Sequence, residues 1–272
     1  MTDWFYSLPL WLSSILVLGL ALAIGLAGSL GVQKLLRLKV NSEEREVAIN
    51  LMQVVAAYVG IMIAFAGVQV WQDFTDSKNA VSGEAATVAQ LYQDLTIFGP
   101  ETGAARSALK NYVVSVTRDE WPMLRRGMGS ESTEIALQTV FKEIGKLNPS
   151  DNRSSAIYEE MLGNLNELID FRHNRIVDSR NGIPGILWTI GLVGGLLTIA
   201  YASAFTPTRY NVFMTAGIAL TLGLVFLFIL TVDYPFKGQF SVSNAPLTEL
   251  LSEFDRLDRM GAEVNREKSA LR

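Results

Sequence analysis

Cysteine is absent from this 272-residue chain, and histidine occurs once. Without cysteine the chain cannot form disulfides, thiolate zinc sites, iron–sulfur clusters or a cysteine nucleophile. A single histidine excludes the two-histidine zinc motif of metalloproteases and disfavours a serine–histidine–aspartate triad. The chain also has no phosphate-binding loop or nucleotide fingerprint. We therefore expect no enzymatic activity, no cofactor and no metal site.

Charged residues are also scarce, at 18% of the chain, whereas about 25% is usual for soluble domains. The net charge of −4 offers no basic surface to a phosphate backbone, so we expect no nucleic-acid partner. Four long stretches contain no charged residue: 8–32, 48–71, 183–205 and 212–232. Each has the roughly 20 apolar residues that a helix needs to cross a bilayer. The sequence therefore predicts an all-α membrane protein with four transmembrane helices.

The remaining residues divide the chain into four regions. We predict transmembrane helices 1 and 2 in residues 1–71, a soluble helical domain in 72–182, transmembrane helices 3 and 4 in 183–232, and a C-terminal helical tail in 233–272. The first apolar stretch is too long for a signal peptide and lacks a basic start, so we expect it to be retained as a helix.

The soluble region has the three- and four-residue apolar spacing of helices. This spacing predicts helices over about 85–95, 101–128, 131–147 and 152–179. Gly99-Pro100 should end the first helix, and Pro122 should kink or end the second near Trp121. In the tail, Pro246 suits a helix start, and an apolar stripe follows it.

The second apolar stretch has the most informative pattern. Small and polar residues recur along one of its faces at steps of three or four: Asn50, Gln53, Ala57, Gly60, Ala64, Gly67 and Trp71. Such a face allows close helix packing, because small residues let two backbones approach. It equally suits a pore lining, where amides meet ions and small residues leave room. Ile61 and Phe65 lie beside this face and could form an apolar constriction. No stretch has a charge at its centre, which disfavours an active transporter.

Three arginines, Arg172, Arg175 and Arg180, come shortly before the third apolar stretch. They could form a basic pore mouth that concentrates anions. Alternatively, they anchor the chain at the membrane interface and pair with Asp170 and Asp178.

Asp233 directly follows the fourth apolar stretch and is a further pore-mouth candidate. It could bind a cation or pair with an arginine. A single carboxylate does not make a calcium site, which needs six or more oxygen ligands.

Several short motifs together resemble those of the bestrophin-like family of bacterial and plant membrane proteins. They are Arg106-x-x-Leu109-x-x-Tyr112, Glu120-Trp121-Pro122, Arg172-x-x-Arg175, Gly182-Ile183-Pro184-Gly185 and Asp233-x-Pro235-Phe236-x-Gly238. Bestrophins are oligomeric anion channels with four spans, cytosolic ends and a cytosolic helical region between spans two and three. The chain departs from them in two respects. The aromatic-rich apolar neck of bestrophins is not evident in the second span, where Phe65 is the only phenylalanine, and the acidic calcium-binding run after their fourth span is reduced to Asp233.

Together the residues and the resemblance favour a homo-oligomeric ion channel of the bacterial inner membrane. Small inorganic ions would pass along the second span, and the resemblance implies that these ions are anions. The charges flanking the spans are evenly divided, so charge counting does not decide the orientation. The resemblance implies that residues 72–182 and both termini face the cytoplasm. The alternative is a non-conducting membrane sensor or scaffold whose helical domain binds a partner.

Overall fold

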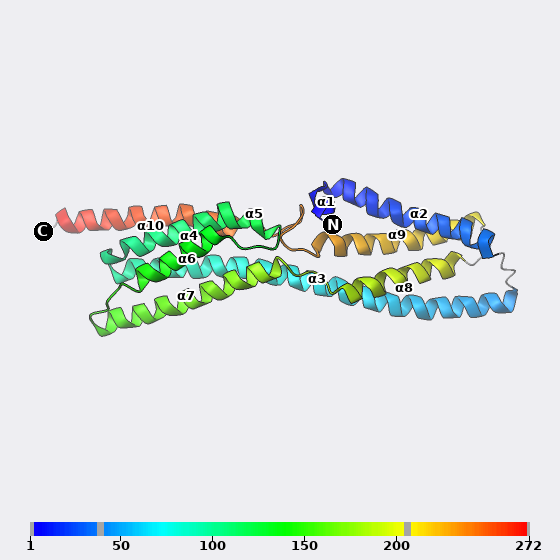
Figure 1. Cartoon of the computed structure of the whole chain (residues 1–272), viewed down its shortest axis with the longest axis horizontal. Coiled ribbons are helices and arrows are strands. Elements are labelled where there is room, and N and C mark those ends of the chain that lie inside the picture. Colours follow the sequence, from blue (N-terminus) through cyan, green and yellow to red (C-terminus); the bar gives the residue numbers. More distant parts are fainter. Residues whose placement is uncertain (1–2, 37–40, 204–207, 271–272) are drawn as a thin grey trace. The chain divides into compact units, whose positions relative to one another are not determined.

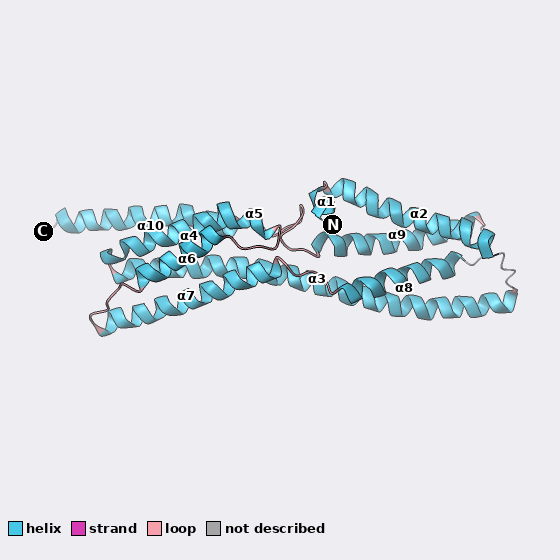
Figure 2. Cartoon of the chain, in the orientation of Figure 1, coloured by secondary structure: helices cyan, strands magenta, loops and turns pink. Residues whose placement is uncertain are grey.

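The structure is a computed structural model, and it describes residues 3–36, 41–203 and 208–270 (Figure 1). These residues form helices joined by short loops, with no β-strand among them (Figure 2). Four of the described helices are long and apolar enough to cross a membrane. The predicted all-α membrane fold is therefore confirmed.

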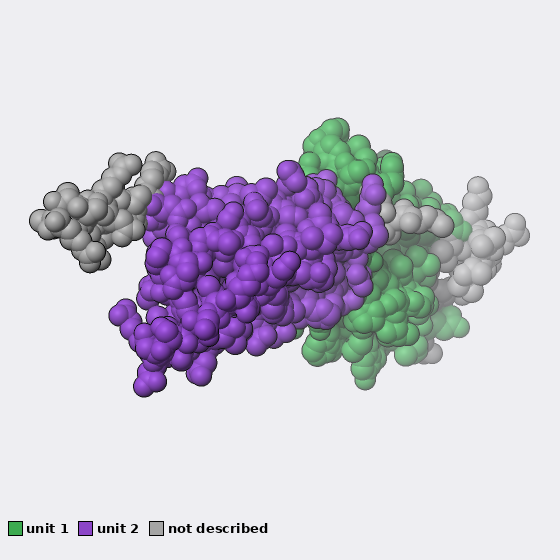
Figure 3. All heavy atoms as spheres, turned by 60° about the vertical axis from the view of Figure 1, so that its left-hand side comes forward, with its two compact units in different colours: residues 1–74, 182–241 green, residues 75–181, 242–272 purple. Residues whose placement is uncertain are grey.

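Two compact units make up the fold (Figure 3). Unit 1 consists of residues 1–74 and 182–241, and unit 2 of residues 75–181 and 242–272. Each unit thus combines segments that are distant in the sequence.

Unit 1 contains the membrane-length helices. They are α2 (Leu10–Leu36), the first part of α3 (Ser42–Phe98), α8 (Gly185–Ser203) and α9 (Arg209–Val232), and the short helix α1 (Asp3–Ser7) precedes α2. Small residues let α2 and α9 approach closely: a Cβ added to Gly25 would lie 2.7 Å from the Cβ of Ala219, and one added to Gly223 would lie 2.7 Å from the Cβ of Ala21. Such close approach is how membrane helices gain packing contacts where water provides no hydrophobic driving force.

A single helix, α3, replaces the two separate helices predicted over 48–71 and 85–95. Neither proline nor glycine occurs between Trp71 and Gly83, so nothing in the sequence interrupts the helix there. Gly83 itself is tolerated because it leaves room for the ring of Phe171, whose nearest atoms would lie 2.5 Å from an added Cβ. The helix ends where predicted, at Gly99, whose φ of 149° is open to glycine but strained for other residues.

Unit 2 is a helical assembly around the second part of α3. Its other elements are η1 (Pro100–Thr102), α4 (Gly103–Ser115), η2 (Val116–Glu120), α5 (Trp121–Leu124), α6 (Glu131–Ile144), α7 (Asn152–Asp178) and α10 (Ala245–Ala270). Its buried core is largely aliphatic and includes Leu91, Leu95, Leu109, Val113, Val140, Leu165 and Leu168. The apolar stripe predicted for the tail is buried at Leu247, Leu250 and Phe254.

Pro122 was expected to kink or end its helix near Trp121, and the structure changes helix type just before this residue. The chain leaves α-helical geometry for the π-helical turn η2, where the Trp121 N–H bonds the carbonyl of Val116, five residues back. Proline has no N–H to donate, and a wider turn accommodates its ring without a clash against the preceding turn. The helix predicted over 101–128 is therefore α4, η2 and α5 in succession.

Candidate functional site

The first part of α3 has one face that packs against its own unit. Val59, Ile63 and Val70 are buried there in a cluster with Ile183 and Ile229. These contacts determine which sides of α3 the described residues leave uncovered.

One uncovered side is the predicted small and polar face. Six of its seven members are exposed: Asn50, Gln53, Ala57, Gly60, Ala64 and Trp71. A Cβ added to Gly60 would meet no atom within 4 Å. Gly67 differs, because it is partly buried and its added Cβ would lie 3.8 Å from Phe228. Packing inside the chain therefore explains the small side chain at Gly67 but not those along the rest of the face.

A second uncovered side of α3 carries bulky residues. Its exposed members recur at steps of three and four: Leu51, Val54, Tyr58, Ile61, Phe65 and Val68. Phe65 is 64% exposed and belongs to this bulky face rather than to the small one. Helix α3 thus presents two different surfaces to whatever surrounds unit 1.

The small face continues into a hollow of about 450 Å³ in unit 1. Its lining combines Ala56 and Gly60 of α3 with Gly217 and Thr221 of α9 and Thr198 of α8. The hydroxyl groups of Thr198 and Thr221 donate to carbonyls of their own helices, so the hollow offers mainly apolar surface.

Two of the predicted pore-mouth residues, Arg172 and Arg175, lie inside unit 2. Arg175 is fully buried and donates from Nε to Glu84 at 2.6 Å and from Nη2 to Glu120 at 2.8 Å. Arg172 donates from Nη2 to Glu120 at 2.7 Å and is also paired with Glu134. Carboxylates of α3, η2 and α6 therefore neutralise both guanidinium groups, and neither is free to meet a passing ion. Their partners are glutamates of other elements, whereas the sequence suggested aspartates of the same helix.

The surroundings of this buried cluster stabilise its charged form. Burial alone would raise the pKa of Glu120, but hydrogen bonding and charge from Arg172, with the charge of Arg175, outweigh burial and hold it below its ordinary value. Tyr112 donates its hydroxyl to Glu84 at 2.6 Å. The Arg175 guanidinium lies 5.7 Å from the ring centre of Trp121. The cluster therefore holds α3, α4, η2 and α7 together.

The third arginine and Asp233 have different surroundings. Arg180 is exposed and donates from Nε to the carbonyl of Gly127 at 2.7 Å. Asp233 is buried in unit 1, where its Oδ1 accepts the backbone N–H of Ile183 at 2.7 Å. It also accepts a hydrogen bond from the side chain of Trp188, and burial raises its pKa. Asp233 thus ties the end of α9 to the segment that enters α8, and its observed partners are N–H groups rather than an arginine.

Sequence reasoning did not identify Glu84, Glu120 or Tyr112 as partners of the arginines. One signal was present: Glu84 shares the helical face of Val81 and Val88, both of which are buried. A carboxylate on a buried face needs a cationic partner, but the sequence did not indicate which cation would supply it.

Comparison with known proteins places the chain in a family. The sequence model of the Bestrophin-like domain matches residues 19–247. No curated protein sequence matches the chain. Among solved structures, a mutant of a bacterial bestrophin homologue from Klebsiella pneumoniae is 18% identical, covers 91% of this chain and 98% of that one, and has a TM-score of 0.69. A second mutant of a bestrophin homologue from this organism is 16% identical, covers 89% and 98%, and has a TM-score of 0.66. At these identities the likeness concerns the fold, while the matched domain shows that this membrane protein belongs to the Bestrophin-like family.

Proposed function

We propose that the protein is an oligomeric ion channel whose pore is lined by the first part of α3. The observation that carries the proposal is the uncovered small and polar face of α3, from Asn50 to Ala64. Polar amides facing lipid would lose hydrogen bonds to water, which is costly. An oligomer axis filled with water satisfies those amides and gives the small residues a reason to be small.

The middle of this face determines how ions would cross. Between Val47 and Trp71 the chain has no charged side chain, so the pore centre has no fixed charge to bind an ion. Ions would therefore keep part of their hydration shell in a water-filled passage, and the conduit would be passive. The preference for anions comes from the family resemblance, with exposed Arg180 as the candidate basic group at a mouth.

Planar-bilayer recording of the purified protein under a salt gradient tests this proposal. Gly60→Leu should abolish or strongly reduce the current, because a bulky group would enter the pore or the contact between copies. Gly19→Leu on α2 is the matched control, since an added Cβ at Gly19 also meets nothing within 4 Å of its own chain. Loss of current in Gly60→Leu alone supports the pore assignment. Equal effects of the two substitutions, or a wild-type protein without current, contradict it.

One observation favours the rival function, a membrane scaffold or sensor. Unit 2 exposes several large apolar side chains, including Ile97, Ile135, Phe141 and Leu162. Such residues on a water-facing unit are typical of a surface that binds another protein or another copy of the chain. A closed, non-conducting oligomer that captures a partner through unit 2 would establish this function in place of conduction.

The proposed topology places unit 2 and both termini in the cytoplasm of a bacterial cell. The chain lacks cysteine, so single cysteines report their side of the membrane without background. A membrane-impermeant thiol reagent should label Asn41→Cys in intact cells and should leave Lys142→Cys unlabelled until the cells are lysed. The opposite labelling pattern would reverse the orientation.

A further inference from the structure

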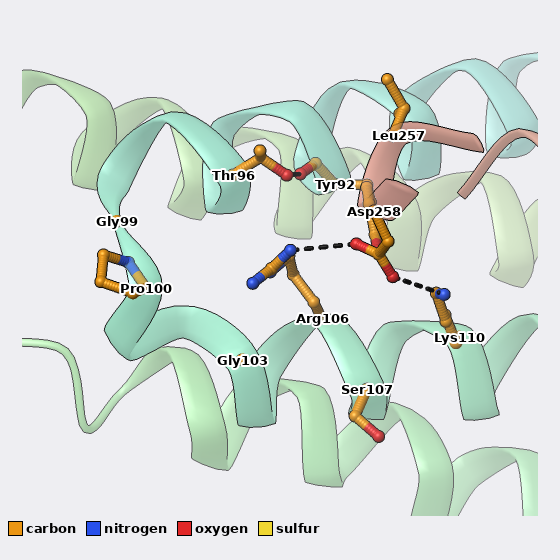
Figure 4. Close-up of a pocket in the computed structure, with 10 residues that line it drawn as sticks. All are labelled: Tyr92, Thr96, Gly99, Pro100, Gly103, Arg106, Ser107, Lys110, Leu257 and Asp258. Atoms are coloured by element: carbon orange, nitrogen blue, oxygen red, sulfur yellow. Dashed lines mark hydrogen bonds and ion pairs between the residues drawn. The ribbon is translucent and has the colours of Figure 1, made fainter. Parts of the chain in front are cut away.

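A cavity of about 650 Å³ lies in unit 2, where the end of α3, the start of α4 and the C-terminal helix α10 meet (Figure 4). The first part of α3 belongs to unit 1, and the proposed pore makes no use of this cavity. The cavity wall has two cationic side chains, Arg106 and Lys110, and one carboxylate, that of Asp258.

Three donors converge on the Asp258 carboxylate. The Tyr92 hydroxyl donates to Oδ1 at 2.5 Å, Arg106 Nη1 donates to Oδ1 at 3.0 Å, and Lys110 Nζ donates to Oδ2 at 2.8 Å. Two of these bonds are drawn as dashed lines in Figure 4. The donors belong to α3 and α4, whereas the acceptor comes from α10. A carboxylate of α10 is thus held by donors from two other helices.

The donor set is adapted to a charged carboxylate. Burial alone would raise the pKa of Asp258, but the hydrogen bonds from Lys110 and Tyr92 and the charges of Lys110 and Arg106 hold it below its ordinary value. Charge-assisted hydrogen bonds of this kind are about twice as strong as neutral ones.

The site retains unused binding capacity beside Asp258. Arg106 Nε is buried and has no hydrogen-bond partner among the described residues, which is costly for a buried donor. Thr96 and Ser107 also line the cavity, and the Thr96 hydroxyl donates to the carbonyl of Tyr92 at 2.8 Å. With two cations and one anion in its wall, the cavity favours an anionic ligand that carries additional polar groups.

We propose that Tyr92, Arg106 and Lys110 bind the carboxylate of a small organic acid, which displaces Asp258 from its position. Asp258 is tethered to the site, so its effective concentration there is on the order of millimolar. A free acid must compete with this resident carboxylate and therefore binds weakly to the wild-type protein. Displacement would leave α10 attached through its apolar stripe, because Phe254 remains stacked on Tyr92 with ring centres 4.1 Å apart.

Calorimetric titration of the full-length protein in detergent with succinate tests the site. Asp258→Asn removes the competing negative charge from the site, so this variant should bind succinate about tenfold more tightly than the wild type. Adding Lys110→Met to Asp258→Asn should abolish the binding. Asp255→Asn is the matched control, because Asp255 also pairs with Lys110 at 2.9 Å but is not among the residues that line the cavity. This variant should bind succinate with an affinity near the wild-type value.

Chemical rescue provides an independent measurement. Asp258→Ala should melt at a lower temperature than the wild type, and sodium acetate should raise its melting temperature more than sodium chloride of equal ionic strength. Equal effects of acetate and chloride would show that the site is only a structural ion pair and would overturn the proposal. Folded Asp258→Asn protein that binds no succinate, or binds it equally with Lys110→Met present, would overturn it as well. None of these readouts depends on conduction.

Discussion

The two parts of helix α3 both bury aliphatic side chains, but among the described residues only the second part also buries a carboxylate. In unit 1 the buried face is aliphatic, with Val59, Ile63 and Val70. In unit 2 the same helix buries Glu84 beside Val88 and Leu91. The difference follows from the surroundings of each part. A charge among membrane helices has few partners and is costly, whereas unit 2 supplies Arg175 and Tyr112 to satisfy the carboxylate.

Different interactions stabilise the interior of each unit. Unit 1 depends on small residues that let its helices touch, as at Gly25 and Ala219. Unit 2 combines an aliphatic core with a buried ion cluster around Arg175. Larger side chains at helix contacts should therefore destabilise unit 1, and removal of a buried charge should destabilise unit 2.

The largest effect is expected from Arg175→Gln. The substitution leaves the buried Glu84 carboxylate without its cation, and removal of one partner from a buried pair typically costs about 3–5 kcal/mol. Thermal unfolding followed by circular dichroism should show a marked fall in the melting temperature. Arg153→Gln, at an exposed position of α7, should change it little. Similar melting temperatures for the two variants would mean that the cluster contributes little to stability.

A smaller effect is expected from Gly25→Val in unit 1. The added atoms would collide with Ala219, and overpacking of this kind costs about 1–3 kcal/mol. Gly19→Val on the same helix is the control, because nothing lies within 4 Å of an added Cβ there. Titration with a denaturing detergent should shift the unfolding midpoint of Gly25→Val alone. A shift in both variants would point to a general effect of valine on α2.

Acid should weaken unit 2 by partial loss of the same cluster. The pKa of Glu120 is lowered in the fold from its ordinary 4.5. Its contribution is therefore fully present above that ordinary value and is lost as the pH falls through the lowered one. Melting temperatures measured from pH 7 downwards should decline below about pH 4.5, and Glu120→Gln should flatten that decline. An equally steep decline in Glu120→Gln would assign the acid sensitivity to other carboxylates.

The smallest effect is expected at the end of α3, from Gly99→Ala. Gly99 has a φ of 149°, and a non-glycine residue in such a region costs about 1–3 kcal/mol. The nearest atoms to an added Cβ belong to the flexible end of Glu101, so we expect a loss near the lower limit. The melting temperature should fall by a few degrees while helical content stays unchanged. An unaltered melting temperature would show that the turn relaxes without strain.

Much of the fold could be predicted from residue patterns. The four membrane-length helices follow from charge-free apolar stretches, and Gly99-Pro100 marks a helix end that the structure confirms. Residue patterns made no separate assignment for residues 72–84, which lie in α3, because a polar stretch without an interrupting proline continues a helix as readily as it forms a loop.

The candidate site was only partly predictable. The periodicity of α3 indicates that Asn50, Gln53 and Gly60 share a face, but it cannot say which face the rest of unit 1 covers. The arginines were recognised as a group, yet their partners Glu84 and Glu120 lie 91 and 55 residues away from Arg175. Sequence spacing describes neighbours on one helix and gives no information about such distant pairs.

The sequence by itself therefore determined the membrane class, the four spans, several helix ends and the family motifs, because apolar length and helix-breaking residues act locally. Tertiary structure alone decided that α3 leaves its small face uncovered, that Arg172 and Arg175 are neutralised inside unit 2, and that Asp258 reaches Tyr92 from 166 residues away. These outcomes depend on which helices pack together, and that choice is made by the whole buried surface rather than by any single segment.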